Sequence, residues 1–288
     1  MSKTAAALAF IVLAGAVSGA GAACTAPGKD AARVSDKAAA QRARACEAAG
    51  NAKAAMAWWR RLADKGSADA QYALGMLYRK GPGAARSDAQ AFRWISKAAA
   101  QGHGEAQVTI GWRYDQGKGV KADGAKARAW YAEAAAKGQA AAQYNLGVLY
   151  DNGRGVAKDP ARAAQWYAQA AAAGHAPAQY RLGVMHARGL GVKRDYGEAR
   201  RWYEAAAAKG FAAAQYNLGV LYAAGRSVER DYARAAALFE KAARQGHARA
   251  QHNLGVLHSH GKGVPQDHAK AYRWYEMAAR QGHAESQN

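Results

Sequence analysis

The stretch AQYNLGV at residues 142–148 occurs a second time, unchanged, at residues 214–220. Its opening Ala-Gln pair recurs every 36 residues, at Ala70, Ala106, Ala142, Ala178, Ala214 and Ala250. Recurrence at one fixed spacing is typical of repeat proteins, in which each unit buries its apolar face against its neighbours. We therefore expect a degenerate unit at residues 35–69, followed by six full units at residues 70–105, 106–141, 142–177, 178–213, 214–249 and 250–285.

Each unit is predicted to contain two helices. In the unit that starts at Ala142, Leu146 and Leu149 continue one helical face, and Gly153 ends the pattern. A second pattern of this kind follows Asp159, whose side chain is expected to cap the new helix. The capping residue recurs in the other units as Ser87, Asp123, Asp195, Asp231 and Asp267.

A glycine lies inside the first predicted helix of every full unit. Glycine within a helix costs about 1 kcal/mol relative to alanine, so its repeated presence predicts a neighbouring helix too close for a β-carbon. We assign this structural role to Gly75, Gly111, Gly147, Gly183, Gly219 and Gly255.

Composition supports helices rather than sheet. Apolar residues make up 50% of the chain and are dominated by alanine, whereas β-branched runs are nearly absent. Alanine-rich helices that carry a few large aromatic side chains pack closely. The sequence therefore predicts an all-α protein, an α-solenoid of about seven antiparallel helix pairs.

The charge and the N-terminus indicate where the protein works. A formal charge of +20 indicates anionic surroundings or partners; the alternative is a solvated basic surface that only keeps the protein soluble. Residues 1–22 have a basic start, an apolar core and small residues before a cleavage site, which is typical of a secretory signal peptide. The alternative is an uncleaved membrane anchor, for which the apolar run is short. We expect an extended segment at 23–34, a short tail at 286–288 and no stable transmembrane span after processing. The expected location is the periplasm or the exterior of a Gram-negative bacterium, away from nucleic acid.

Only two cysteines occur, Cys24 and Cys46. In an oxidising compartment, a disulfide between them would tie the mature N-terminus to the first helix. The alternative is a lipoprotein whose Cys24 is acylated, although Gly21 stands where lipoproteins usually have leucine.

The repeated pattern A-x-x-x-L-G-x-x-Y, G-x-G-V and D-x-x-x-A-x-x-W-Y-x-x-A-A-x-x-G resembles the Sel-one-like repeat family, a variant of the tetratricopeptide repeat. The resemblance covers about three-quarters of the chain. It implies a right-handed α-solenoid that works as a scaffold or adaptor and holds partners along its concave surface. A cysteine-rich branch of the family has been linked to β-lactam binding. A β-lactam-binding hydrolase is thus a distant alternative, because the full repeats of this chain contain no cysteine.

The resemblance also implies binding residues. In some tetratricopeptide domains, residues at a similar place on the first helix bond the backbone or the terminal carboxylate of a peptide. Amides can bond any main chain, and an arginine can hold a carboxylate through two hydrogen bonds. The predicted contacts with a protein or peptide ligand are Tyr144, Asn145, Tyr180, Arg181, Tyr216, Asn217 and Asn253. The alternative is that they are solvated helix residues.

No residue pattern predicts catalysis, a cofactor or a metal. Ser259 and Lys262 match S-x-x-K, but this match lies where a helix runs into a glycine turn. His258, His260 and His268 crowd the last unit, where they are more simply read as helix-end residues than as ligands. We expect a non-catalytic exported scaffold. The alternative is an envelope protein that binds an anionic glycan or lipid through its basic surface.

Overall fold

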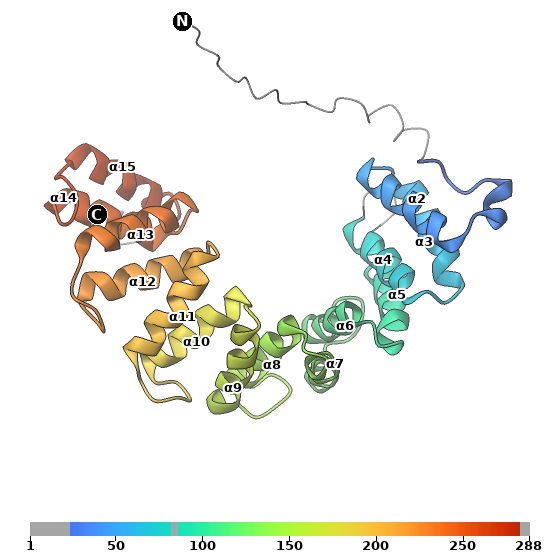
Figure 1. Cartoon of the computed structure of the whole chain (residues 1–288), viewed down its shortest axis with the longest axis horizontal. Helices are drawn as coiled ribbons and strands as arrows, with labels where there is room; N and C mark the ends of the chain where they lie inside the picture. Colours follow the sequence, from blue (N-terminus) through green and yellow to red (C-terminus); the bar gives the residue numbers. More distant parts are fainter. Residues whose placement is uncertain (1–23, 82–85, 283–288) are drawn as a thin grey trace, which may run out of the picture. The chain divides into compact units, whose positions relative to one another are not determined.

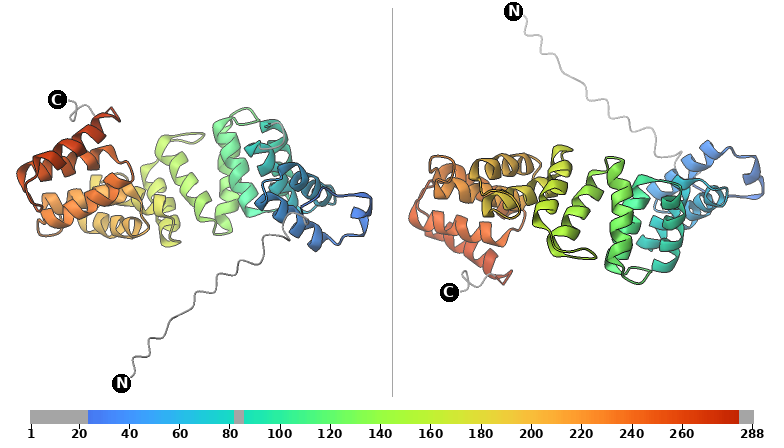
Figure 2. Two further views of the ribbon diagram at one scale, coloured as in Figure 1. Left: turned by 90° about the horizontal axis from the view of Figure 1, so that it is seen from above. Right: turned by 90° about the horizontal axis from the view of Figure 1, so that it is seen from below.

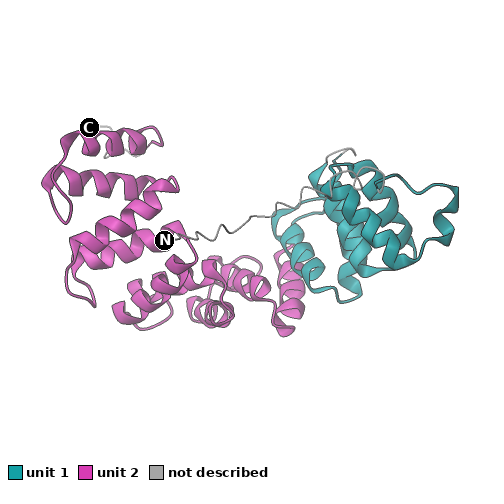
Figure 3. Ribbon diagram, turned by 45° about the horizontal axis from the view of Figure 1, so that its top comes forward, with its two compact units in different colours: residues 1–122 teal, residues 123–288 magenta. Residues whose placement is uncertain are grey.

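The structure is a computed structural model that describes residues 24–81 and 86–282. Within these ranges, every regular element is helical: fourteen α-helices and one short 3-10 helix (Figure 1). The predicted signal peptide and the tail at 286–288 lie outside the described residues. The helices fall into two compact units, unit 1 at residues 1–122 and unit 2 at residues 123–288 (Figure 3).

Nearly all the α-helices have the same length, and constant helix and loop lengths together give the constant repeat. The helices of unit 1 are η1 (Lys29–Arg33), α2 (Asp36–Ala48), α3 (Ala52–Asp64), α4 (Ala68–Lys80), α5 (Asp88–Ala100) and α6 (Gly104–Gln116). Those of unit 2 are α7 (Gly124–Ala136), α8 (Ala140–Asn152), α9 (Pro160–Ala172), α10 (Ala176–Arg188), α11 (Tyr196–Ala208), α12 (Ala212–Ala224), α13 (Tyr232–Arg244), α14 (Ala248–His260) and α15 (His268–Ala279).

Consecutive helices form hairpins, and the hairpins stack on one another. In unit 2, α8 packs on α9, α9 on α10, and α10 on α11, and the series continues to α15 (Figure 2). Unit 1 stacks in the same way from α2 to α6. The predicted all-α solenoid of helix pairs is thus confirmed.

Helix ends follow the local sequence signals. The side chain of Asp159 accepts a hydrogen bond from the backbone N–H of Arg162 at 2.9 Å. The same cap is formed by Asp123, Asp195, Asp231, Asp267 and Ser87. At the other end of α8, Gly153 adopts a left-handed conformation with φ 68°, which side chains other than glycine disfavour.

The core consists of one alanine-lined seam per hairpin. The alanine of each Ala-Gln pair is fully buried, as are Leu146, Leu149 and Tyr167. A β-carbon built on Gly147 would lie 2.6 Å from two ring carbons of Tyr167, and one built on Gly183 would lie 2.7 Å from the ring of Tyr203. Close approach of the second helix therefore excludes a side chain at these glycines. Gly75, Gly219 and Gly255 meet Ile95, Phe239 and Tyr275 in the same way, and Gly111 lies buried at the same place in α6.

The glutamine of each Ala-Gln pair is buried as well, which polarity alone does not predict. The side-chain amide donates to a carbonyl near the end of the preceding helix in Gln71, Gln107, Gln179, Gln215 and Gln251. The Nε2 of Gln251 lies 3.1 Å from the carbonyl oxygen of Ala243, and Gln179 binds Ala171 at the same distance. The last carbonyl groups of a helix have no partner within that helix, so the glutamine amide supplies one. Because the two residues belong to neighbouring hairpins, each such bond joins one hairpin to the next.

In three repeats, the Oε1 of the buried glutamine accepts a hydrogen bond from the side-chain amide of another glutamine. The pairs are Gln101 to Gln71 at 2.7 Å, and Gln245 to Gln215 and Gln281 to Gln251 at 2.8 Å. Ala173 and Lys209 occupy the corresponding C-cap position in two other units. There the Oε1 atoms of Gln143 and Gln179 are buried without a hydrogen bond.

The N-terminal segment is fixed to the first hairpin. A disulfide joins Cys24 to Cys46 on α2, and both cysteines are buried. The indole Nε1 of Trp58 donates to the carbonyl oxygen of Thr25 at 2.7 Å. Residues 29–33 form η1, so the segment predicted to be extended contains one short helix.

Candidate functional site

The predicted tyrosines link neighbouring hairpins through ring contacts. The ring centroid of Tyr144 lies 5.6 Å from that of Tyr167 on α9 and 4.9 Å from that of His175 at the start of α10. Tyr216 repeats this arrangement, at 5.7 Å from Phe239 and 4.7 Å from His247. Each tyrosine is half-buried, so part of its ring area packs within the protein and the remainder faces outward.

Histidine occupies the N-cap of three first helices. The Nδ1 atoms of His103, His175 and His247 accept the backbone N–H three residues later at 3.2, 3.3 and 3.2 Å. This bond requires an unprotonated Nδ1. Burial lowers the pKa of His175 and His247, which favours the neutral ring that the cap needs.

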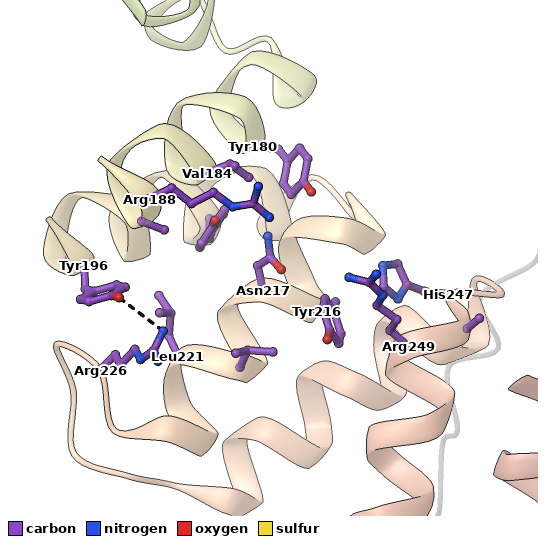
Figure 4. A pocket seen from close by; sticks show the side chains of 14 residues that line it. Tyr180, Val184, Arg188, Tyr196, Tyr216, Asn217, Leu221, Arg226, His247 and Arg249 are labelled. Atoms are coloured by element: carbon purple, nitrogen blue, oxygen red, sulfur yellow. Dashed lines mark hydrogen bonds between the residues drawn. The ribbon is translucent and has the colours of Figure 1, made fainter. Parts of the chain in front are cut away.

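One groove in unit 2 brings predicted residues together. It has a volume of about 550 Å3 and is lined by residues of α10, α11, α12 and the start of α14. Tyr180, Tyr216 and Asn217 line it (Figure 4). Burial raises the pKa of Tyr203, and the neighbouring Asn217 side chain partly offsets that rise, which places the amide close to the Tyr203 hydroxyl.

The groove is basic. Arg188, Arg226 and Arg249 line it, and its lining contains no aspartate or glutamate. Arg226 donates to the Tyr196 hydroxyl at 3.3 Å and stacks over that ring at 5.1 Å. Figure 4 shows Arg226 at one end of the groove, Arg249 at the other, and Arg188 with Asn217 between them. The site can therefore present cationic donors, hydroxyls and an amide to one elongated ligand.

The other predicted contact residues lie elsewhere. Burial lowers the pKa of Arg181, but the nearby tyrosines, Tyr144 above all, raise it more. Neither Arg181, Tyr144 nor Asn145 lines the groove. Asn253 lines a smaller apolar cavity of about 290 Å3 with Val256 and its neighbours. The structure thus gathers three of the seven candidates. Sequence reasoning missed the three arginines because their positions carry other residues in most repeats.

In the last unit, Ser259, Lys262, His258 and His260 each contact a different group. The ammonium of Lys262 lies over the ring of Tyr232 at 5.8 Å, and the carbonyl oxygen of Ser259 accepts a bond from Gln266. The Nδ1 of His258 contacts the carbonyl oxygen of Pro265, whereas that of His260 contacts Val256. Among residues 24–81 and 86–282, no group of three or more His, Cys, Asp or Glu side chains could hold a metal ion. No helix of these ranges is long and apolar enough to cross a bilayer.

Comparison with known families identifies the repeat. A family model described as "Sel1 repeat" matches residues 47–67, 68–103, 104–139, 140–175, 176–211, 212–247 and 248–283. The chain belongs to the Sel1 repeat family. The shortened first match falls on the second half of the degenerate unit, and each full match begins two residues before an Ala-Gln pair, at the start of the first helix.

Solved structures of other proteins have the same architecture as this Sel1 repeat protein. The protein c5321, described as a protective antigen of uropathogenic Escherichia coli with an SLR fold, is 29% identical with a TM-score of 0.74; the match covers 90% of this chain but only 64% of that protein. A Sel1 repeat protein from Oxalobacter formigenes is 33% identical with a TM-score of 0.69, over 75% of this chain and 84% of that one. A search of curated proteins found no match.

Proposed function

We propose that this Sel1 repeat protein is a non-catalytic scaffold that binds a protein or peptide segment on the face of its first helices. One observation carries this proposal: Tyr180, Tyr216 and Asn217 come together in the groove of unit 2. The groove extends across several helices and offers the Asn217 amide close to the Tyr203 hydroxyl. These features suit an extended chain, which needs backbone hydrogen bonds and flat aromatic contacts.

Two asparagines at the same repeat position provide a matched test. Asn217 lies in the groove, whereas Asn145 lies at the equivalent place outside it. Immobilised full chain would be used to capture binding proteins from the envelope fraction of the source organism, at low and at high salt. We expect Asn217→Ala to lose the captured protein and Asn145→Ala to retain it. Equal retention by both variants would contradict groove binding.

A second candidate function rests on charge. The formal charge of +20 suits an envelope protein that holds an anionic glycan or lipid through its basic surface. Such binding should collapse between low and high ionic strength, because exposed charges are screened beyond about 8 Å at physiological salt. Binding in the groove should depend less on salt and more on Asn217.

Export is part of the proposal. The Cys24–Cys46 disulfide supports an oxidising compartment, the periplasm or the exterior of the cell. The mass of the mature N-terminus is the measurement: it should correspond to cleavage after Ala22 or Ala23, with both cysteines oxidised. A diacylated Cys24 would instead make the protein a lipoprotein, and hydrolysis of a β-lactam by the purified chain would overturn the non-catalytic assignment.

A further inference from the structure

The charge within the groove is more specific than the charge of the whole chain. Lysine and arginine outnumber aspartate and glutamate by 41 to 21 overall, so a surface stretch of this protein normally carries both signs. Many exposed arginines are indeed paired within their own helix, as Arg201 is with Glu198 at 2.8 Å and Arg244 with Glu240 at 2.5 Å. The groove departs from this rule because its lining contains three arginines and no carboxylate.

Two of these arginines have no ion-pair partner among the described residues. Arg188, at the last turn of α10, and Arg249, in the first turn of α14, are exposed and form no salt bridge there. The helix dipole places partial positive charge at the N-terminal end of α14, which favours an acidic side chain there and disfavours the guanidinium of Arg249. Placing cations there without a protein counter-charge leaves them available to a ligand.

Apolar and aromatic side chains share the lining with the arginines and Asn217. Val184 and Val220 are half-buried in the lining, and the rings of Tyr180 and Tyr216 flank them. A ligand that matches this surface carries negative groups at intervals and apolar groups between them. An extended peptide with alternating side chains meets that requirement, since successive side chains point to opposite faces of the chain.

We infer that the groove of unit 2 selects an acidic peptide segment, in which carboxylates meet Arg188, Arg226 and Arg249 and apolar side chains contact Val184 and Val220. This inference rests on the proposed peptide-binding function and adds the chemistry of the ligand. Arginine binds carboxylates through two parallel hydrogen bonds, and the Asn217 amide remains beside the peptide backbone.

The direct test compares two fluorescein-labelled peptides by fluorescence anisotropy with the full chain. One is an octapeptide of alternating glutamate and leucine, and the other replaces every glutamate by glutamine. We expect the acidic peptide to bind at least about a hundredfold more tightly at 0.15 M salt, because each carboxylate that meets an arginine contributes about one factor of ten in affinity. Equal affinities would refute the inference, and this comparison needs no altered protein.

Matched variants locate the effect. Arg188→Gln with Arg249→Gln should weaken the acidic peptide by roughly a hundredfold, at about tenfold for each arginine. The control is Arg128→Gln with Arg273→Gln, which removes the same charge from exposed positions on α7 and α15 outside the groove. We expect the control to change the affinity less than about twofold, because salt screens distant charges. Equal weakening by both pairs would show attraction by net charge alone and overturn the site.

The remaining outcomes separate the inference from the proposed function. If both peptides bind equally and Asn217→Ala weakens both, peptide binding stands and the preference for acid fails. If neither peptide binds and Asn217→Ala captures the same proteins as the unaltered chain, both fail. Binding of phosphatidylglycerol vesicles through the same arginines, without binding of the acidic peptide, would assign the groove to a lipid headgroup and overturn the inference.

Discussion

The Oε1 atoms of Gln143 and Gln179 are buried without the amide donor that the equivalent glutamine has in three other repeats. For Gln143, one substitution can supply that donor. Gln245, the C-cap of α13, donates to Gln215 at 2.8 Å. Ala173 is the C-cap of α9 and has nearly the same backbone, with φ −74° and ψ 5° against −87° and 6°. Ala173→Gln should therefore place an amide against the unpaired Oε1 of Gln143.

The size of the effect follows from three contributions. Pairing a buried acceptor that had no partner is favourable by about 1–3 kcal/mol, and a hydrogen bond contributes about 0.5–1.5 kcal/mol. The two figures count part of the same free energy, so they are not added in full. Ordering a glutamine side chain costs up to about 2 kcal/mol. We expect a net gain of about 1 kcal/mol, equivalent to a rise in Tm of roughly 2–4 °C for a protein of this size.

The assay is chemical denaturation followed by far-UV circular dichroism, with a double-mutant cycle. Ala173→Gln is measured in the unaltered chain and again in a Gln143→Leu background, where the acceptor is gone. The gain should vanish in that background, because it depends on the Oε1 of Gln143. A gain of the same size in both backgrounds, or no gain in either, would refute the reasoning. The reverse change, Gln245→Ala, should destabilise the protein by about 1–3 kcal/mol, because it leaves the Oε1 of Gln215 buried alone.

Three other predictions concern the packing, the caps and the disulfide. Gly147→Leu should destabilise unit 2 by about 2 kcal/mol or more, because its β-carbon would overlap the ring of Tyr167; an unchanged Tm would contradict close helix approach. Burial lowers the pKa of His247 below its unfolded value, so the unfolded state binds more protons, and stability should fall as the pH drops below about 6.5. Denaturation at pH 7 and pH 5 should show a smaller loss for His247→Asp, which caps the helix without that titration; equal losses would exclude the cap as the cause. Reduction of the Cys24–Cys46 bond should cost about 3 kcal/mol and speed hydrogen exchange in α2, and unchanged exchange would show that the bond does not hold this helix.

Much of the fold could be read from the sequence because its causes are local and repeated. Asp159 caps a helix through its own backbone neighbours, and Gly153 ends one through its own φ angle. The period of 36 residues repeats these signals in register, so any single unit predicts the others. The role of Gly147 was also predictable, because a residue that disfavours helices recurs inside one and a close neighbour is the physical reason to keep it.

Other features depend on neighbours that the sequence does not identify. Gln251 is a polar residue on a helix face, and it is buried because the carbonyl of Ala243 from the preceding hairpin lies within reach of its amide. Arg188, Arg226 and Arg249 are far apart in the chain and occupy three different positions within the repeat. The sequence by itself determined the helices, their ends and their spacing, since those follow from contacts within one unit. Only the stacked structure decided which side chains of three successive hairpins meet in one groove, because that convergence depends on how one hairpin lies on the next.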